Sequence, residues 1–330
     1  MQTEAMTELE KIHTSTSPAR LYALLLRLRP LQQGTLMPFS GELVHGAFLK
    51  WLRAAAPDVA AWLHSGQKRR LFTCSSLLFS PSLQPHIKAE RENTHLPLDP
   101  QKTYIIRLTL LLGDLFPIFH DALTRFDTSH LQTNALPFIQ LGKQIFLLEE
   151  VILENEHLSG WTGFTSLASL IEQASQAKLS STTPLTLEFA SLTTFNRGSK
   201  KTGYGTYPVI LPLPQFVFQN LLKRWQDVAP PELINVIQTE RLEQYLQDDG
   251  IIITDYHLTA HRVTFTTHVQ RGFLGTCTYQ LRDSAEQVSS QDPAVPLTLH
   301  QQIYLLARLA FYSGIGYKTA MGLGQARLRV

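Results

Sequence analysis

The sequence predicts an α+β protein made of two consecutive units, each with the element order β-α-β-β-α-β. Short apolar runs typical of buried strands alternate with segments whose apolar residues recur at helical spacing. A polar stretch rich in Ser and Thr, residues 177–184, separates the first series of elements from a second one. With 330 residues, the chain is long enough for two domains of typical size.

The first unit begins with an apolar run at residues 21–28, which predicts a buried strand. Side chains alternate between the two faces of a strand, so Arg27 and Arg29 share one face and Tyr22 lies on the other. The elements expected after it are a helix at 41–55 between the capping residue Ser40 and Pro57, strands at 71–79 and 104–112, a helix at 114–126, a hairpin at 138–148 that turns at Gly142-Lys143, and a short helix at 165–174.

The second unit ends on a helix and a strand. Ile303, Leu306 and Ala307 recur at helical spacing, and the last six residues alternate between apolar and polar. The expected elements are a strand at 185–193, a basic loop at 196–206, helices at 214–226 and 231–247, strands at 251–258, 261–269 and 273–281, a helix at 297–312 and a final strand at 325–330. We expect a flexible polar extension at 1–18, a first domain at 19–180 and a second domain at 181–330.

Composition excludes several classes of protein. A net charge of +2 is too small to indicate nucleic-acid binding without local clusters of basic residues. Cys74 and Cys277 lie far apart and form no C-x-x-C motif, which argues against a disulfide scaffold or a zinc site and fits a reducing cytosol. No apolar run approaches the length of a membrane helix, and no secretory signal is visible. We therefore expect a cytoplasmic protein.

Four of the 18 glycines fall in one short segment near the C-terminus, around Lys318. Glycine is kept where φ must be positive or where a ligand approaches the backbone, and a lysine among glycines is suited to a phosphate-bearing ligand. A helix-capping glycine and a tight connection would explain one or two of these positions, but not all of them. The cluster consists of Gly314, Gly316, Gly322 and Gly324.

Two familiar phosphate-binding loops do not fit this cluster. A P-loop requires Gly directly before Lys-Ser/Thr, but Tyr317 precedes Lys318 here. A dinucleotide-binding turn runs from a strand to a helix, whereas this segment runs from a helix to a strand, and Thr319 stands at the third glycine position.

His45 is the sharpest single candidate for catalysis. It lies one turn into the predicted helix, at the edge of an apolar stripe, where packing can hold the ring while it still reaches a cleft. A histidine with an ordinary pKa suits proton transfer at neutral pH. The alternative is that His45 has no catalytic role and is simply one of the chain's 12 histidines, placed where the core meets the surface. Lys50 lies about 140° around the helix from His45, which favours a solvated lysine.

Two further groups of residues have spacings or neighbours that could indicate a binding site. His257 and His261 have the spacing H-x-x-x-H, but on a strand they are about 13 Å apart, so we expect no metal site. Arg197, Lys200 and Lys201 lie among glycines and tyrosines. Basic and aromatic groups together are suited to single-stranded RNA, because cations neutralise phosphates and rings stack on bases.

The segment Leu309–Gly324 resembles the C-terminal glycine-rich signature of the CRISPR repeat-processing endoribonucleases of the RAMP superfamily, of the Cas6 type. Residues 272–279 and 212–225 resemble two other stretches of the family, and 41–49 is similar to the segment with its catalytic histidine. The resemblance extends over most of the chain from about residue 21 and implies two ferredoxin-like (RRM-like) domains in tandem.

The resemblance also implies a reaction and a set of roles. The family cleaves CRISPR precursor RNA within each repeat, without a metal or other cofactor, by attack of a ribose 2′-OH that leaves a 2′,3′-cyclic phosphate and a 5′-OH. His45 fits the acid or base role, with Tyr22, Arg27, Arg29 and Lys50 as candidate helpers. The expected RNA-binding residues are Gly314, Gly316, Lys318, Gly322, Gly324, Arg197, Lys200 and Lys201.

Two other functions stay open at this point. A non-catalytic RNA-binding RAMP subunit of a CRISPR effector complex would have the same fold, glycine segment and basic clusters. An enzyme that binds a nucleotide or a phosphorylated metabolite is the more distant alternative, and the two failed loop motifs count against it.

Overall fold

A computed structural model describes residues 20–64, 71–78, 87–124, 138–153, 160–199, 205–283 and 297–329. The chain forms two compact units. The first contains the described residues up to Phe164, together with Thr264–His268 and Ala320–Gly322. The second contains Thr165–Val263, Val269–Thr319 and Leu323–Val330. The division thus falls earlier than the expected residue 180, because helix α6 (Leu167–Gln176) packs against helix α10 (Leu299–Ser313) of the second unit.

The first unit is built on an antiparallel sheet of ferredoxin-like order. Its strands lie in the order β3-β5-β1-β7-β6, so β1 is paired with both β5 and β7. The strands are β1 (Arg20–Pro30), β3 (Phe72–Cys74), β5 (Tyr104–Leu110), β6 (Phe138–Leu141) and β7 (Gln144–Ile152), and the smaller elements are the paired strands β2 (Gly34–Leu36) and β4 (Leu96–Leu98), and helix α4 (Ile87–Glu92).

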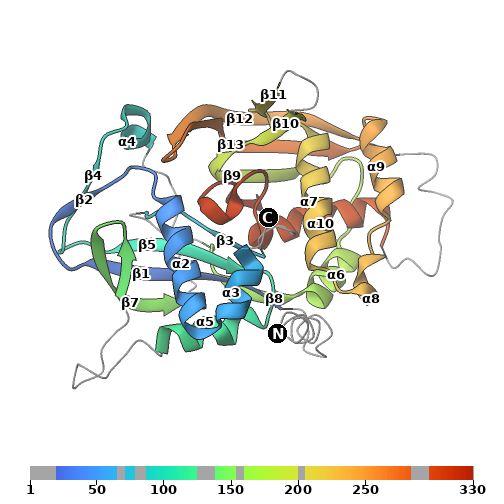
Figure 1. The fold of residues 1–330 in the computed structure, drawn as a ribbon. Helices are drawn as coiled ribbons and strands as arrows, with labels where there is room; N and C mark the ends of the chain where they lie inside the picture. Colours follow the sequence, from blue (N-terminus) through green and yellow to red (C-terminus); the bar gives the residue numbers. More distant parts are fainter. Residues whose placement is uncertain are drawn as a thin grey trace. The chain divides into compact units, whose positions relative to one another are not determined.

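Three helices pack together on one side of this sheet, namely α2 (Gly41–Ala55), α3 (Pro57–His64) and α5 (Leu115–Thr124) (Figure 1). Aromatic rings fill the layer between helices and sheet: Phe48 of α2 lies 4.5 Å from Phe72 and 5.9 Å from Phe119, measured between ring centroids. Tyr22 of β1 stacks on Phe116 of α5 at 4.5 Å. Even-numbered residues of β1 therefore face the helices.

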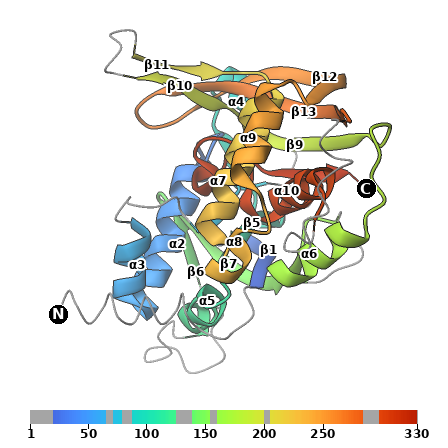
Figure 2. The ribbon, with the colours of Figure 1, turned by 90° about the vertical axis from the view of Figure 1, so that its right-hand side faces the viewer.

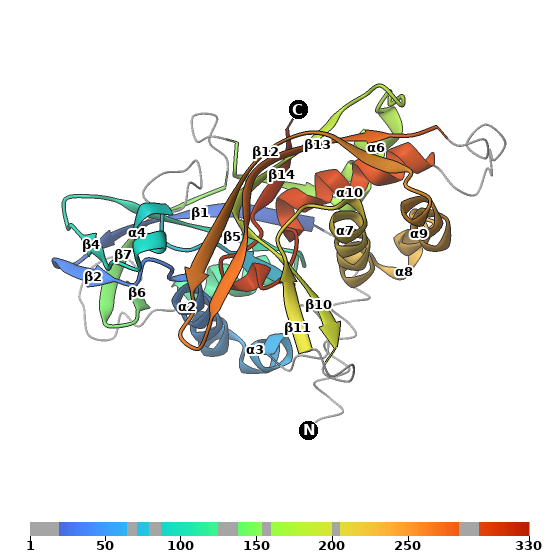
Figure 3. The same ribbon diagram turned by 90° about the horizontal axis from the view of Figure 1, so that it is seen from above.

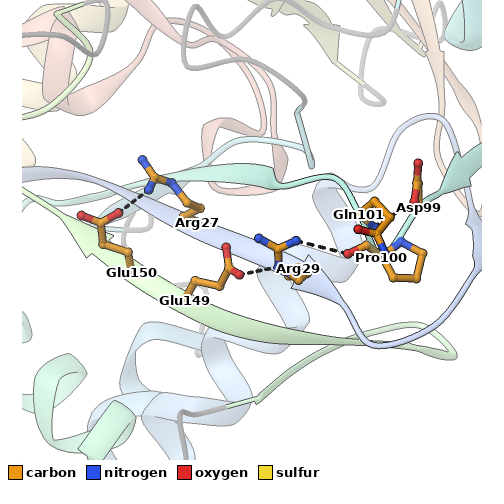
Figure 4. Close-up of polar contacts among 7 residues, drawn as sticks. All are labelled: Arg27, Arg29, Asp99, Pro100, Gln101, Glu149 and Glu150. Carbon is orange, nitrogen blue, oxygen red and sulfur yellow. Dashed lines mark hydrogen bonds and ion pairs between the residues drawn. The ribbon is translucent and has the colours of Figure 1, made fainter.

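The odd-numbered Arg27 and Arg29 project from the other face of β1. Strand β7 has an irregularity at this point: Arg27 is opposite Glu150 and the next residue of β1 is opposite Leu148, which leaves Glu149 as an extra residue. Both glutamates can therefore reach the arginines. Arg27 Nη1 lies 2.6 Å from Glu150 Oε2, and Arg29 Nε is paired with Glu149 (Figure 4).

The second unit repeats the same topology with insertions. Its sheet has the order β12-β13-β9-β14, in which β9 (Leu185–Thr193) is antiparallel to both β13 (Val269–Leu281) and β14 (Ala326–Arg329). Helix α10 packs against β9 and β14 of this sheet, and α7 packs against both α10 and α9 (Figure 2). The remaining elements are β12 (Ile251–Thr264), α7 (Pro214–Val228), α8 (Pro231–Ile234), α9 (Thr239–Gln247), and the hairpin β10 (Phe195–Ser199) and β11 (Gly205–Val209), while the short strand β8 (Gly163–Ser166) spans the division between the units.

The expected α+β class with tandem ferredoxin-like domains is confirmed, but four local predictions were wrong. Within the predicted loop at 196–206, the described residues 196–199 and 205–206 belong to the strands of the hairpin β10–β11, which is a separate ribbon beside the sheet (Figure 3). The predicted helix at 231–247 is divided into α8 and α9, and the two strands predicted at 251–258 and 261–269 are largely one strand, β12.

The fourth error concerns the strand expected at 71–79, which ends at Cys74. The Ser75 hydroxyl accepts a hydrogen bond from the amide of Arg107, at 2.8 Å, while the Ser75 amide donates to the Arg107 carbonyl, also at 2.8 Å. The Ser75 hydroxyl thus replaces a backbone carbonyl as the acceptor in the pairing with β5. Backbone pairing resumes only at the isolated bridge between Leu78 and Ile105. Such competition by serine is not visible in apolar periodicity.

The glycine-rich segment connects α10 to β14 and is packed against the protein. The amide of Gly324 donates to the Leu192 carbonyl at 2.9 Å, and the amide of Gly316 donates to Asn220 Oδ1 at 2.9 Å. Both glycines have a positive φ, of 69° and 96°. Backbone conformation and packing therefore explain why these two positions are glycine: a side chain would be strained and would have no space.

Within the described residues, no helix combines the length and the apolar character that crossing a membrane requires.

Replacing Gly324 by Ala is expected to destabilise the protein by about 3 kcal/mol, because the new Cβ would lie 2.1 Å from the Ile315 carbonyl oxygen at a positive φ. The matched control is Gly46→Ala in α2, where a Cβ meets nothing within 4 Å. That change is expected to stabilise the protein by about 1 kcal/mol, since alanine favours a helix interior. Chemical denaturation measures both. Equal stability of the two variants would contradict the packing described here.

Candidate active site

His45 is buried at the first turn of α2, with 7% of its surface exposed. Its Nδ1 lies 2.8 Å from the backbone oxygen of Ala320, a residue 275 positions away that belongs to the same compact unit. Its ring stacks on Phe72 of β3, with 5.4 Å between the centroids and 17° between the planes. The imidazole is thus fixed both along its edge and against one face.

The contact with Ala320 decides which nitrogen of His45 carries a proton. A carbonyl oxygen can only accept, so Nδ1 must donate. In the neutral ring, Nε2 then has the lone pair, and in the cation it carries the second proton. This arrangement is what a general base or acid requires, because one nitrogen orients the ring and the other exchanges a proton with the substrate.

The N-terminus of α2 is held by the two short segments that complete the first unit. Glu42 Oε2 accepts hydrogen bonds from the amide and from the hydroxyl of Thr266, both at 2.8 Å. A Cβ at Gly41 would lie 2.1 Å from the carbonyl oxygen of Met321, so only glycine permits this approach. A role for Thr266 could not be predicted, because nothing in the neighbouring sequence indicates contact with a helix more than 200 residues away.

The residues considered as helpers of His45 have other contacts. Tyr22 stacks on Phe116, and Lys50 is exposed on α2. Arg27 and Arg29 are paired with Glu150 and Glu149 on the face of the sheet opposite the helices, and Arg29 also donates to the Pro100 carbonyl at 3.3 Å. These contacts give both arginines a structural role and do not join them to His45.

The expected RNA-binding residues fall into three groups. The four glycines of the cluster are buried, whereas Tyr317 has 39% of its surface exposed and the neighbouring Lys318 is half-buried. Lys318 Nζ lies 5.6 Å from the centre of the Tyr317 ring, and the φ of Lys318 is 55°. The turn therefore presents one ring and one cation rather than a row of free glycine amides.

Arg197 is exposed on β10, and its guanidinium lies 5.1 Å from the centre of the Phe216 ring. Tyr207 of β11 is directly opposite Arg197 in the hairpin and has 54% of its surface exposed. Lys200 and Lys201 lie outside the described residues. The hairpin thus carries an exposed cation, Arg197, and an exposed aromatic ring, Tyr207, on one ribbon.

His257 and His261 both lie on β12, the former exposed and the latter buried. In the described ranges, no three side chains of His, Cys, Asp or Glu come together as metal ligands would.

Comparison with known proteins gives a family match for part of the chain. Residues 179–326 match the family model described as CRISPR-associated endoribonuclease Cas6. These residues include α7, the strands β9, β12 and β13 of the second sheet, and the whole glycine cluster. No curated protein matches the sequence.

Solved structures resemble the chain over nearly its whole length. The product complex of Cas6 (TTHB231) is 24% identical, with a TM-score of 0.69, and the alignment covers 94% of this chain and 100% of that one. The product complex of Cas6 (TTHA0078) is 23% identical with a TM-score of 0.63, and it covers 94% and 100%. Thermus thermophilus Cas6 (TTHB231) is 23% identical with a TM-score of 0.60, and it covers 94% and 98%.

At these identities the structural likeness establishes the fold. The sequence match includes Leu309–Gly324, the segment that resembles the family's C-terminal glycine-rich signature. The chain therefore has the two-domain fold of the Cas6 structures, and its residues 179–326 match the Cas6 family model.

Proposed function

We propose that this protein is an endoribonuclease that cleaves CRISPR precursor RNA within its repeats. The family match of residues 179–326 supports the substrate, and two proteins of the same fold are known as product complexes. The single observation that carries the catalytic part is the hydrogen bond from His45 Nδ1 to the Ala320 carbonyl, at 2.8 Å. It orients a buried imidazole for proton transfer through Nε2.

The proposed reaction is an internal transesterification. The ribose 2′-oxygen forms a bond to the adjacent phosphorus as its proton leaves, and the bond from phosphorus to the 5′-oxygen breaks. The products are a 2′,3′-cyclic phosphate and a 5′-OH. His45 Nε2 either takes the proton from the 2′-OH, while water protonates the departing 5′-oxygen, or protonates the 5′-oxygen, while water accepts the proton of the 2′-OH. Either role requires a single positioned nitrogen.

The RNA is proposed to bind along the glycine-rich turn and the β10–β11 hairpin. Lys318 and Arg197, together with Lys200 and Lys201 in the sequence between the strands, supply cations for phosphates, and Tyr317 and Tyr207 supply rings for bases. Gly314, Gly316, Gly322 and Gly324 act indirectly, since they allow the tight turn that presents Tyr317 and Lys318. We propose no catalytic role for Arg27, Arg29, Tyr22 or Lys50.

Replacing His45 by Asn is expected to reduce the rate of single-turnover cleavage by about 10²- to 10⁴-fold, the usual contribution of a general acid or base. Asparagine can still donate to the Ala320 carbonyl from near the Nδ1 position, so the fold and the affinity for repeat RNA should be unchanged. The control is His95→Asn, which changes an exposed histidine in the same unit. Wild-type protein that binds repeat RNA tightly without cutting it would instead favour the non-catalytic RAMP subunit.

Replacing Lys318 by Gly is expected to weaken RNA binding without harming the fold. The variant removes one cation, so the slope of log K against log salt concentration should fall by roughly 0.7 to 0.9. It also relieves the positive φ of 55°, so the melting temperature should rise slightly. Lys178→Gly, at an exposed lysine of the same unit, serves as the control for loss of charge. Identical slopes for the two variants would remove Lys318 from the interface.

Cleavage is expected to continue in excess EDTA, because the proposed mechanism assigns no proton transfer to a metal-bound water. The assay compares single-turnover rates with EDTA and with magnesium, and the ends of the product are analysed for a cyclic phosphate. A product with a 3′-OH, or a rate that EDTA abolishes and magnesium restores, would contradict the mechanism.

A further inference from the structure

The backbone oxygen of Ala320 accepts two hydrogen bonds. One comes from His45 Nδ1, at 2.8 Å, and the other from the thiol of Cys74, whose Sγ lies 2.9 Å away. All three residues are buried and belong to the first unit. A carbonyl oxygen has two lone pairs, so both donors can be satisfied at the same time. The group that orients His45 is therefore itself held by a second side chain.

The thiol can serve as this donor because it keeps its proton. Burial raises the pKa of Cys74 well above its usual value, and a hydrogen bond from the Gly322 amide lowers the pKa by a smaller amount. The same sulfur thus donates to Ala320 and accepts from Gly322. These two contacts tie Cys74 to both ends of the short segment that completes the first unit.

Strand β3 supplies both supports of the imidazole. Phe72 and Cys74 are two residues apart on the strand, so their side chains lie on the same face. Phe72 stacks on the His45 ring, while Cys74 holds the carbonyl to which that ring donates. The strand is anchored by its pairing with β5, in which Cys74 is opposite Leu108, and its residues are fully buried. The supports are therefore rigid.

We propose that Cys74 is a positioning residue for His45: it fixes the Ala320 carbonyl so that the imidazole keeps its proton on Nδ1 and reacts through Nε2. The cysteine itself does not touch the substrate or exchange a proton. This role rests on the proposed function, but the tautomer that it predicts is a property of the protein without RNA.

The first test measures the tautomer of His45 in the full-length wild-type protein by nitrogen-15 NMR of the histidine rings. The His45 signals are those missing from His45→Asn. The expected result is a neutral ring protonated on Nδ1. A ring protonated mainly on Nε2 would overturn the proposal, whether or not the protein cleaves RNA. Conversely, absence of cleavage with the expected tautomer would refute the proposed function and leave the positioning geometry standing.

The second test compares Cys74→Ala with Cys74→Ser. Alanine removes the donor, so we expect the single-turnover cleavage rate to fall about fivefold, the usual effect of one hydrogen bond, with a smaller fraction of the Nδ1-protonated ring and an unchanged Kd for repeat RNA. Serine restores a donor and should recover most of the rate and the tautomer. Cys277→Ala, at the other buried cysteine, is the control.

A merely structural role gives a different pattern. In that case Cys74→Ala lowers the melting temperature, but the folded fraction cleaves at the wild-type rate and retains the wild-type tautomer, and this outcome would overturn the proposal. If alanine prevents folding, Cys74→Ser and the wild-type tautomer decide: a serine variant with the wild-type melting temperature but without the Nδ1-protonated ring would also overturn it.

Discussion

The hydrogen bond between His45 and the Ala320 carbonyl is the interaction on which the candidate active site depends. An imidazole has two nitrogens of similar basicity, and a free histidine presents either of them. A fixed acceptor at Nδ1 removes that ambiguity and leaves one nitrogen for chemistry. Because the acceptor is a backbone atom, no substitution at Ala320 removes it, and the site depends instead on whatever holds that stretch of backbone in place.

The glycines of the cluster flank this stretch of backbone in the sequence, and the structure explains two of them. The positive φ angles and the bonded amides show that Gly316 and Gly324 shape a compact turn against β9 and α7. The same turn exposes Tyr317 and continues directly into Ala320. One short segment of the chain therefore carries both the side chains suited to RNA and the carbonyl that orients His45. The proposed RNA binding and the proposed proton transfer depend on neighbouring residues of this segment.

The charged residues of β1 illustrate how a sequence pattern can mislead. Arg27 and Arg29 lie near a catalytic candidate in sequence and would suit an oxyanion, yet an extra residue in β7 brings Glu149 and Glu150 to them (Figure 4). A cation already paired with a carboxylate is less available to stabilise negative charge in a substrate. The alternation of β1 was predicted correctly, but the irregularity in the neighbouring strand has no signature in β1 itself.

Those parts of the protein that arise from local order could be predicted from the amino-acid sequence. Apolar periodicity located most strands and helices, including α2 with His45 at the edge of its apolar stripe, and glycine frequency located the turn before β14. The surroundings of His45 became visible only in the folded chain: the carbonyl of Ala320, the ring of Phe72 and the thiol of Cys74. They could not be predicted because the contacting residues are far apart in the sequence. His45 and Ala320 are 275 residues apart, and a contact made by folding at that distance leaves no periodicity or spacing in the sequence near either residue.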